Sequence, residues 1–459
     1  MQYISTRNAE SVFSFKEVFL KGLASDGGLF VPKSLPFYST KELIRLNDLS
    51  YNELASEIIL KFCSDEFSKL DVEEIINNSY TNFRVKNIVE IKNLNQLNLL
   101  ELFHGPTLAF KDIAMQVIGN MYEKILKKNN LKINIIVATS GDTGAAAIDA
   151  LRDRNNMKIF VLHPENRISD VQRKFMTTVA SKNVFNIALD SNFDDCQKFV
   201  KEMFADKVFS KSVNMSGVNS INWVRIVVQI VYYFFAYLNL AKDGEKINFS
   251  VPTGNFGDIY AGYIAKKMGL PINKLIIATN NNDILKRTIN SGLYKPLKVK
   301  QTISPSMDIQ VASNFERLIF DICQSSSKKV IKLMNDLKEY GEFQLEKEDL
   351  KKINAIFCSE SVSEDETINT IKKMYNTEGI LIDPHTAVAI EAFNKLNIEG
   401  TSIILSTAHP SKFSDVVMKA TGIKPELPES VKNILTKKEN YKKLPKDLRK
   451  IQNYILEKI

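Results

Sequence analysis

The sequence predicts an α/β protein with two doubly wound lobes, each built on a mostly parallel sheet, and a mainly helical N-terminal segment. Short, mostly apolar runs recur along the chain, as expected for strands that are buried on both faces of a parallel sheet. Helical patterns of apolar residues separate these runs, and strands that alternate with helices imply βαβ units. A chain of 459 residues is long enough for two or three domains around a large core.

These patterns divide the chain into three ranges. Residues 1–95 have helical apolar spacing after an opening turn, "SDGGLFVP". Residues 96–240 are expected to form one α/β lobe and residues 241–459 the other. The predicted strands are Ile133–Ala138, Met157–Pro164, Val184–Leu189, Ile247–Pro252, Lys274–Thr279 and Thr401–Ser406.

Two charged segments lie in the last third of the chain. The acid- and lysine-rich stretch Ser326–Glu366 indicates solvated helices and connections. The final residues, "KKLPKDLRKIQNYILEKI", have the pattern of a basic amphipathic helix. For that helix a structural docking arm is favoured over an anion-binding role.

Composition excludes several classes of protein. The hydrophobic fraction of 44% and charged fraction of 25% are typical of a globular protein. Although the net charge is +8, the basic residues are interleaved with acids and form no block with aromatics, which argues against nucleic-acid binding. The four cysteines are far apart without a CxxC pair, so neither a disulfide framework nor a zinc site is expected.

No segment has the pattern of a membrane span or an export signal. The longest apolar run, Val224–Leu238, is too short and too interrupted to cross a bilayer, and a helix buried on most sides is expected there. The N-terminus "MQYISTRNAE" has no apolar signal core. We therefore expect a cytoplasmic protein without a membrane partner.

Lys111 stands in an apolar context. The apolar residues from Phe110 onward have helical spacing, which places Lys111 near the N-terminus of a helix, beside the face that packs. A buried lysine near the positive end of a helix dipole is disfavoured as a cation, so its pKa should fall. A neutral amine is a nucleophile suited to Schiff-base formation with an aldehyde. Spacing alone favours the alternative, a lysine that extends its head group into water.

Three of the predicted strands are followed by turns of small and polar residues. Their sequences are "TSGDTGAAA" (Thr139–Ala147), "PTGNFGDIYAG" (Pro252–Gly262) and "STAHPSKF" (Ser406–Phe413). Such turns expose backbone N–H groups at a helix N-terminus, where the helix dipole favours anions. Ligands of α/β sheets bind beyond the carboxyl ends of the strands. One such turn is weak evidence, but three of them together with Lys111 indicate a binding site.

Taken together, these segments resemble the threonine synthases, and two further segments resemble the bacterial and fungal branch of that family. The resemblance covers nearly the whole chain in the family's order. It implies the fold of the tryptophan-synthase β-subunit, which is fold type II of the pyridoxal-phosphate (PLP) enzymes. The matching segments are "SFKEVFLKGLASDGGLFVP", "HGPTLAFKD", "ATSGDTGAAA", "NMSGVNSINWVRIVVQ", "PTGNFGD" and "STAHPSKF".

The resemblance implies roles for the residues around the cofactor. Lys111 would be the Schiff-base lysine and a proton shuttle. Thr407 would lie near the cofactor ring, where its hydroxyl can hydrogen-bond the pyridine nitrogen. The turn that holds the cofactor phosphate would consist of Gly254, Asn255, Phe256, Gly257 and Asp258. Because a carboxylate is a poor neighbour for a phosphate, the Asp258 side chain is expected to point at the helix N-terminus or another donor.

The resemblance also implies a substrate side. Thr139, Ser140 and Thr143 would bind the amino-acid carboxylate, the alternative being a turn that only caps the following helix. Asn219, Ser220, Asn222 and Arg225 would bind the substrate phosphate, with a structural ion pair as the alternative for Arg225. Weaker candidates are Lys174 and Asp112, whereas structural roles are favoured for His104 and His409, and no metal-ligand spacing is present.

The reaction implied is that of a lyase in threonine biosynthesis. It converts O-phospho-L-homoserine and water to L-threonine and phosphate by elimination and hydration, in a monomer or homodimer. Two alternatives remain open. No residue excludes a related phospholyase that releases phosphate, ammonia and a 2-oxo acid. A non-catalytic phosphate-binding module would leave Lys111 unexplained, and neither a GxGxxG fingerprint nor a GxxxxGK[ST] loop is present.

Overall fold

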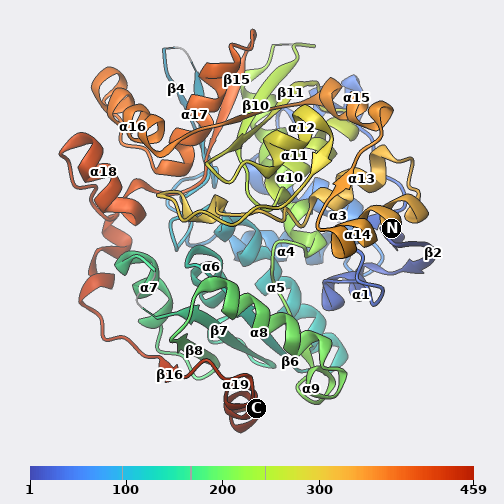
Figure 1. Ribbon diagram of the computed structural model, residues 1–459, viewed down its shortest axis with the longest axis vertical. Coiled ribbons are helices and arrows are strands. Elements are labelled where there is room, and N and C mark those ends of the chain that lie inside the picture. Colours follow the sequence, from blue (N-terminus) through green and yellow to red (C-terminus); the bar gives the residue numbers. More distant parts are fainter. Residues whose placement is uncertain (96, 166–167, 243) are drawn as a thin grey trace.

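The computed structural model describes residues 1–459 except 96, 166–167 and 243, and it has a larger and a smaller α/β lobe (Figure 1). The larger lobe contains a six-stranded sheet in which all neighbouring strands are parallel except β4 and β5. Its strands, in spatial order, are β14 (Phe357–Ser361), β11 (Ile272–Thr279), β10 (Ile247–Pro252), β15 (Ser402–Ser406), β5 (Asn98–Glu101) and β4 (Glu90–Asn93).

The smaller lobe contains a five-stranded, fully parallel sheet. Its strands, in spatial order, are β16 (Lys442–Leu444), β8 (Val184–Leu189), β7 (Met157–Pro164), β6 (Ile133–Ala138) and β9 (Met215–Ser216). The helices of this lobe are α5 (Lys111–Asn129), α6 (Asp142–Leu151), α7 (Asp170–Thr177), α8 (Phe193–Ala205), α9 (Lys207–Ser212) and α19 (Leu448–Lys458).

All six strands predicted from apolar runs are present. β6, β7, β8 and β10 have the predicted bounds, while β11 begins two residues earlier and β15 one residue later than expected. Their side chains are mostly buried on both faces of the sheets, which is why each strand is visible as an apolar run. The predicted fold class, with mostly parallel sheets and a helical N-terminus, is confirmed.

The two lobes do not coincide with the ranges 96–240 and 241–459, because each range contributes a strand to the sheet of the other lobe. Strand β5 lies at the start of the first range, yet it pairs with β15 in the larger sheet. Strand β16 and helix α19 lie at the end of the second range but belong to the smaller lobe, where Ile451 and Ile455 join its hydrophobic core. The segment after α18 (Ser414–Thr421) therefore runs from the larger lobe down to the smaller one (Figure 1), and α19 docks as a structural arm.

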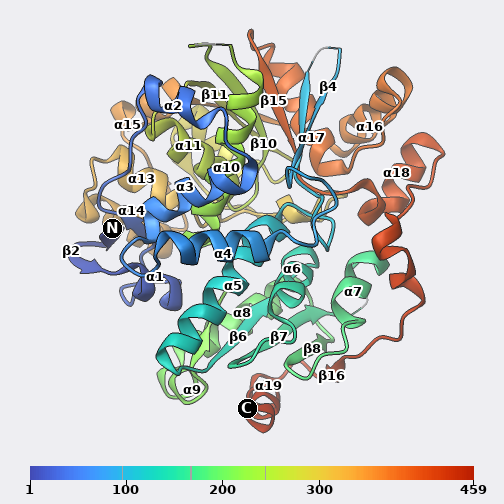
Figure 2. The ribbon, with the colours of Figure 1, turned by 180° about the vertical axis from the view of Figure 1, so that it is seen from behind.

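The N-terminal segment forms helices as predicted. Each of α1 (Phe15–Lys21), α2 (Thr40–Leu46), α3 (Tyr51–Cys63) and α4 (Lys69–Ser79) starts with a serine that forms a capping box with an acid three residues later. Figure 2 shows α3 and α4 on the back of the molecule, where they pack against α10 (Trp223–Leu240) and α5.

A three-stranded antiparallel sheet in the N-terminal segment was not predicted. Its order is β2 (Asn8–Phe13), β1 (Tyr3–Ser5) and β3 (Phe30–Pro32). Strands β1 and β3 have only three residues each, and β2 is mostly exposed. Strands this short or this polar leave no periodic apolar signal.

The prediction for Ser326–Glu366 was incomplete. The stretch contains α14 (Ser327–Tyr340), α15 (Lys347–Ile356) and the start of α16 (Glu364–Glu378), as expected for helices and connections. It also contains β14, an edge strand of the larger sheet with the polar sequence FCSES. A partly buried edge strand tolerates polar side chains, so composition hides it.

Most of the remaining elements surround the larger sheet. Helix α10 contains the run expected to be a buried helix. Among the described residues it is the one helix long and apolar enough to cross a membrane, and 83% of it is buried inside the protein. The other elements are α11 (Gly257–Lys267), α12 (Ile284–Ser291), β12 (Leu293–Tyr294), η1 (Pro305–Met307), α13 (Phe315–Ile322), β13 (Phe343–Gln344), α17 (Pro384–Leu396), η2 (Pro410–Phe413) and η3 (Glu429–Thr436). Of these, η2 and η3 also contact α7 of the smaller lobe.

Candidate active site

A cavity of about 170 Å³ lies where the carboxyl ends of strands from both sheets meet. All three turns singled out in the sequence contribute to its wall: the β6–α6 turn, the β10–α11 turn and the segment after β15. Residues of α5, α8, α10 and α17 and the segment around η1 also line the cavity. Segments up to 300 residues apart in the sequence therefore form one site, at the position that the parallel-sheet rule predicts.

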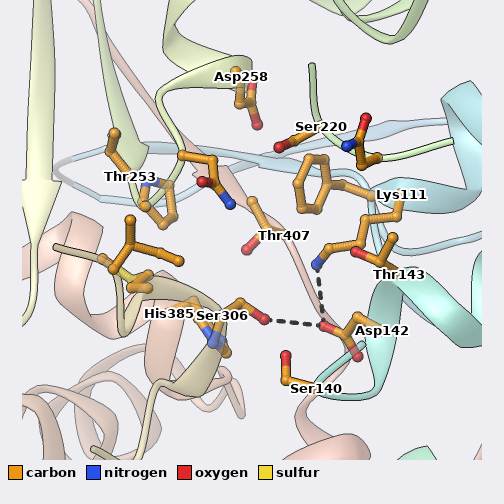
Figure 3. A pocket seen from close by; sticks show the side chains of 18 of the residues that line it. Lys111, Ser140, Asp142, Thr143, Ser220, Thr253, Asp258, Ser306, His385 and Thr407 are labelled. Atoms are coloured by element: carbon orange, nitrogen blue, oxygen red, sulfur yellow. Dashed lines mark hydrogen bonds and ion pairs between the residues drawn. The ribbon is translucent and has the colours of Figure 1, made fainter. Parts of the chain in front are cut away.

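Lys111 is the first residue of α5 and is buried at this cavity. Its Nζ lies 3.3 Å from Oδ2 of Asp142 and 4.6 Å from the centroid of the Phe110 ring. Burial lowers the pKa of the Lys111 amine, although Asp142 opposes this shift. Figure 3 shows the amine in the centre of the cavity, next to Thr407. The alternative of a lysine extended into open water does not fit this placement.

The hydroxyl groups of the β6–α6 turn have two different roles: one holds the turn, and the others face the cavity. The Oγ1 of Thr139 accepts hydrogen bonds from the N–H groups of Gly141, at 3.0 Å, and Gly144, at 2.9 Å, and so holds the start of α6. Gly141 has a φ of 135°, which only glycine adopts readily. Ser140 and Thr143 line the cavity near Lys111 (Figure 3). The capping role therefore belongs to Thr139, and the other two hydroxyls face the ligand space.

The β10–α11 turn presents backbone donors to the cavity. The strand ladder ends with the N–H of Thr253, which donates to the carbonyl of Ala278 at 2.8 Å. Within the described residues, the next three N–H groups, those of Gly254, Asn255 and Phe256, have no acceptor. Phe256 has a φ of 64° and caps α11 without a side-chain hydrogen bond. Free N–H groups at a helix N-terminus form an anion-binding site.

Two contacts hold this turn in place. The carbonyl of Asn255 accepts hydrogen bonds from the backbone N–H of Asn314 at 3.1 Å and from its Nδ2 at 3.0 Å. The same Nδ2 lies 3.2 Å from the carbonyl of Ser220, which also lines the cavity. Asn314, which the sequence analysis did not select, therefore ties the β10–α11 turn to the segment before α10.

Asp258 is at the cavity margin, with its carboxylate held by two tyrosines of α10. Tyr232 Oη donates to Oδ1 at 2.5 Å and Tyr233 Oη at 2.9 Å. Burial raises the pKa of Asp258 to about 6, and the two tyrosine hydrogen bonds only partly offset this. The expectation that this carboxylate points at another donor agrees with the geometry. Gly257, the first residue of α11, also lines the cavity.

Arg225 lies in the cavity wall without a carboxylate partner in the described part of the chain. Its NH1 group is 3.4 Å from the carbonyl of Val218, and its Nε has no hydrogen-bond partner there. Burial lowers the pKa of the guanidinium to about 10. The structural ion pair considered for Arg225 is thus not observed, and a buried cation with free donors fits an anionic ligand.

Of the other three residues predicted to bind the substrate phosphate, two line the cavity and one does not. Asn219 and Ser220 line the cavity with Arg225. Asn222 does not, because its side chain is used to cap α10. Its Oδ1 accepts from the N–H of Val224 at 3.1 Å, and its Nδ2 donates to the carbonyl of Phe19 at 3.2 Å. The structure therefore does not bring Asn222 to the ligand space.

Several polar side chains at the cavity were not selected from the sequence. Asp142 lies inside the quoted motif "ATSGDTGAAA". Lys412, which does not line the cavity but contacts Asp142, lies inside "STAHPSKF". His385 lies two residues after Asp383, the N-cap residue of α17. The Nδ1 of His385 is 2.7 Å from Oδ2 of Asp383. The Nε2 of His385 accepts a hydrogen bond of 3.3 Å from the N–H of Ser306, in η1, where the sequence analysis found no motif.

The weaker candidates have structural contacts. Lys174 donates to the carbonyl of Lys437 at 2.9 Å, outside the cavity. Asp112 accepts hydrogen bonds from the backbone N–H and the hydroxyl of Thr107. His104 lies 3.1 Å from Glu101, and His409 caps η2. These placements agree with the structural roles favoured for both histidines.

Comparison with known proteins places this geometry in context. Family models described as "Threonine synthase N terminus", "Pyridoxal-phosphate dependent enzyme" and "Threonine synthase, C-terminal" match residues 2–80, 83–336 and 386–455. Threonine synthases of Pseudomonas aeruginosa and Saccharomyces cerevisiae are 43% and 42% identical to this chain. The alignments cover 99% and 100% of the chain and 98% of each relative. The crystal structure of PLP-bound threonine synthase from Brucella melitensis has a TM-score of 0.96 and 42% identity, covering 100% of this chain and 99% of that one.

Proposed function

Since the chain belongs to the threonine synthase family, a family of PLP-dependent lyases with fold type II, we propose that it converts O-phospho-L-homoserine and water to L-threonine and phosphate. One observation connects this proposal with particular residues. One cavity is faced by a buried lysine amine, by a turn whose N–H donors are free and by a buried guanidinium that lacks a carboxylate partner, both absences being counted among the described residues. These groups are the ones that an aldehyde cofactor and two phosphate groups require.

The residues of the cavity fit pyridoxal phosphate. Lys111 supplies the amine for its aldehyde, and the N–H groups of Gly254, Asn255 and Phe256 supply donors for its phosphate. Gly257 and Asp258 complete this turn, and the Thr407 hydroxyl lies beside the Lys111 amine, where it can meet the pyridine ring (Figure 3). Bound PLP supplies an electron sink that acidifies the C–H bonds next to the substrate amino group.

The side chains of the protein bind the substrate and move its protons. Ser140 and Thr143 hold the substrate carboxylate, with Thr139 maintaining the turn that carries them. Arg225 binds the substrate phosphate with Asn219 and Ser220. Lys111 Nζ would take protons from the substrate and return them. Burial of the cavity limits access of water.

Product analysis tests the reaction. The purified chain is loaded with PLP and given O-phospho-L-homoserine, and phosphate, L-threonine, ammonia and 2-oxobutyrate are measured over time. We expect one threonine for each phosphate released. Formation of 2-oxobutyrate and ammonia in place of threonine would establish the phospholyase instead. A colourless protein that binds phosphate but releases none from the substrate would establish the non-catalytic module.

Gly254 provides a test of the cofactor turn. A Cβ at Gly254 would lie 2.8 Å from the carbonyl oxygen of Ser306 and 3.1 Å from Cγ1 of Ile309, so Gly254→Ala must displace the turn. Overpacking of this kind costs about 1–3 kcal/mol. We expect the affinity for PLP to fall by about tenfold or more in a spectrophotometric titration.

Gly257→Ala is the matched control. The nearest atoms to its added Cβ are Asn314 Nδ2 at 3.3 Å and Ile226 Cδ1 at 3.7 Å, both at the ends of side chains. The affinity of this variant for PLP should fall less than that of Gly254→Ala, because its added Cβ approaches a side-chain amide at 3.3 Å and not a backbone carbonyl at 2.8 Å. Equal losses in the two variants would show that the turn does not hold the phosphate by its backbone.

We propose further that the enzyme acts in the cytoplasm on a small-molecule substrate, as a monomer or homodimer, without nucleic-acid or membrane partners. The four cysteines are free, which fits a reducing compartment. Light scattering on the purified holoenzyme distinguishes the two oligomeric states, and cell fractionation tests the location.

A further inference from the structure

Asp142 joins two buried lysines at the cavity. Its Oδ1 lies 2.7 Å from Nζ of Lys412, and its Oδ2 lies 3.3 Å from Nζ of Lys111. Gln172 Nε2 donates to Oδ1 at 2.9 Å, and Ser306 Oγ is 3.4 Å from Oδ2. Figure 3 shows Asp142 with its dashed contacts to Lys111 and Ser306. One carboxylate therefore serves two amines, and Lys412 is the closer of the two.

Lys412 is held as a buried cation. Its side chain has no exposed surface, and Nζ donates to Asp142 and to the carbonyl of Thr107, at 2.7 Å in each case. The same Nζ lies 5.4 Å from the centroid of the Phe175 ring, a favourable site for a positive charge. The contacts of Lys412 in the described residues thus suit an ammonium group, and none of them involves the amine of Lys111.

The charge balance of this trio determines the state of Lys111. With Lys412 protonated and Asp142 ionised, the pair is neutral and Lys111 can lose its proton without leaving a buried carboxylate unpaired. Without Lys412, Asp142 would keep Lys111 as its one lysine partner among the described residues and would hold it as an ammonium ion. Two like charges that share one counter-ion also repel each other, which favours the neutral form of the more weakly paired amine.

We propose that Lys412 is a positioning residue which, as the closer counter-ion of Asp142, leaves the Lys111 amine uncharged and able to react, while Asp142 keeps that amine in place. This inference rests on the proposed function only in taking Lys111 as the reacting amine. Other charged groups around Lys111 do not replace Lys412. Arg225 also lowers the pKa of Lys111, but Lys412 and not Arg225 forms the ion pair with Asp142 in the described residues. Asp258, another acid at the cavity, is paired with two tyrosines.

The pKa of Lys111 is the direct readout, and it needs no substrate. The full chain is freed of PLP, its lysines are labelled with trace acetic anhydride at pH values from 6 to 11, and the Lys111 peptide is quantified by mass spectrometry. Lys412→Met should raise the pKa of Lys111 by about one unit or more, which lowers its labelling at pH 7.5 about tenfold. Asp142→Asn should lower the pKa, and the double variant should lie between the two single variants.

Controls separate this effect from general damage. Lys174→Met removes a lysine whose partners lie outside the cavity, and it should leave the pKa of Lys111 unchanged. Thermal melting shows whether each variant is folded; if Lys412→Met does not fold, Lys412→Gln, which removes the charge but keeps a donor for Asp142 and the Thr107 carbonyl, replaces it and should shift the pKa of Lys111 in the same direction. The proposal would be overturned if the pKa of Lys111 were unchanged or lower in Lys412→Met. It would also be overturned if the pKa of Lys111 were unchanged or higher in Asp142→Asn. A chain that shows the expected shifts but forms no threonine would overturn only the proposed function.

Discussion

Replacement of Lys111 by alanine abolishes the visible absorption band near ~410–420 nm, a property of the lysine-bound cofactor, and threonine formation with it. The variant loses the amine that holds PLP and the base that moves protons, and proton transfer by a positioned group alone contributes about 10²–10⁴-fold. We therefore expect kcat to fall by about a thousandfold or more. Absorption spectra and a threonine assay on the purified variant measure both effects.

Lys286→Ala is a suitable control for this experiment. Lys286 lies on α12 and pairs with Glu360 away from the cavity, so its replacement should change neither the spectrum nor the rate. If Lys111→Ala kept both the band and threonine formation, another amine would be the anchor, and the assignment of the cavity would be wrong.

Replacement of Arg225 by methionine lowers kcat/KM for O-phospho-L-homoserine by about 10- to 100-fold, mainly through a higher KM. Hydrogen bonds to charged groups contribute about 1.5–3 kcal/mol each. The affinity for PLP should change little, because the β10–α11 turn holds that phosphate. The midpoint of thermal unfolding should stay the same or rise, since Arg225 leaves no carboxylate partner behind in the described residues.

Arg317 is the matched control because it is a buried arginine whose donors are used. It bonds to the carbonyls of Phe30, at 3.0 Å, and Ile221, at 2.6 Å, and to the side chain of Asn314. Arg317→Met should therefore lower the unfolding midpoint, whereas Arg225→Met should not. A loss of stability in Arg225→Met equal to that in Arg317→Met, with an unchanged KM, would assign Arg225 a structural role.

The strands were predictable where burial on both faces demanded apolar residues. The run Ile133–Ala138 is mostly apolar because β6 lies inside a parallel sheet. Strand β5 is also inside its sheet, but four residues are too few to distinguish from a helix or loop. The polar β14 lies at an edge, and β1 and β3 are shorter still. These strands exist because distant partners complete their hydrogen bonds, and that information is not local.

The site, like the strands, was predictable from the sequence only in part. The three turns were predictable together, because each follows a buried strand of the same type. Spacing alone favoured a Lys111 head group in water, and only the resemblance to the family pointed to its buried role at the cofactor. Asn222 was not distinguishable from Ser220, since only the structure shows that its side chain caps α10. The contact between Asp142 and Lys412 joins residues 270 positions apart, and neither residue alone predicts the other.

The position of β15 between β10 and β5 has a consequence for synthesis of the protein. Until Ser406 has left the ribosome, the nascent chain carries two open strand edges in the middle of its larger sheet, and such edges invite association with other chains. Thr407 and Lys412 emerge only after that strand. The vitamin B6 pocket is therefore among the last parts of the molecule to form, and a growing polypeptide must be protected by chaperones, or fold quickly after release, before it can take up its coenzyme.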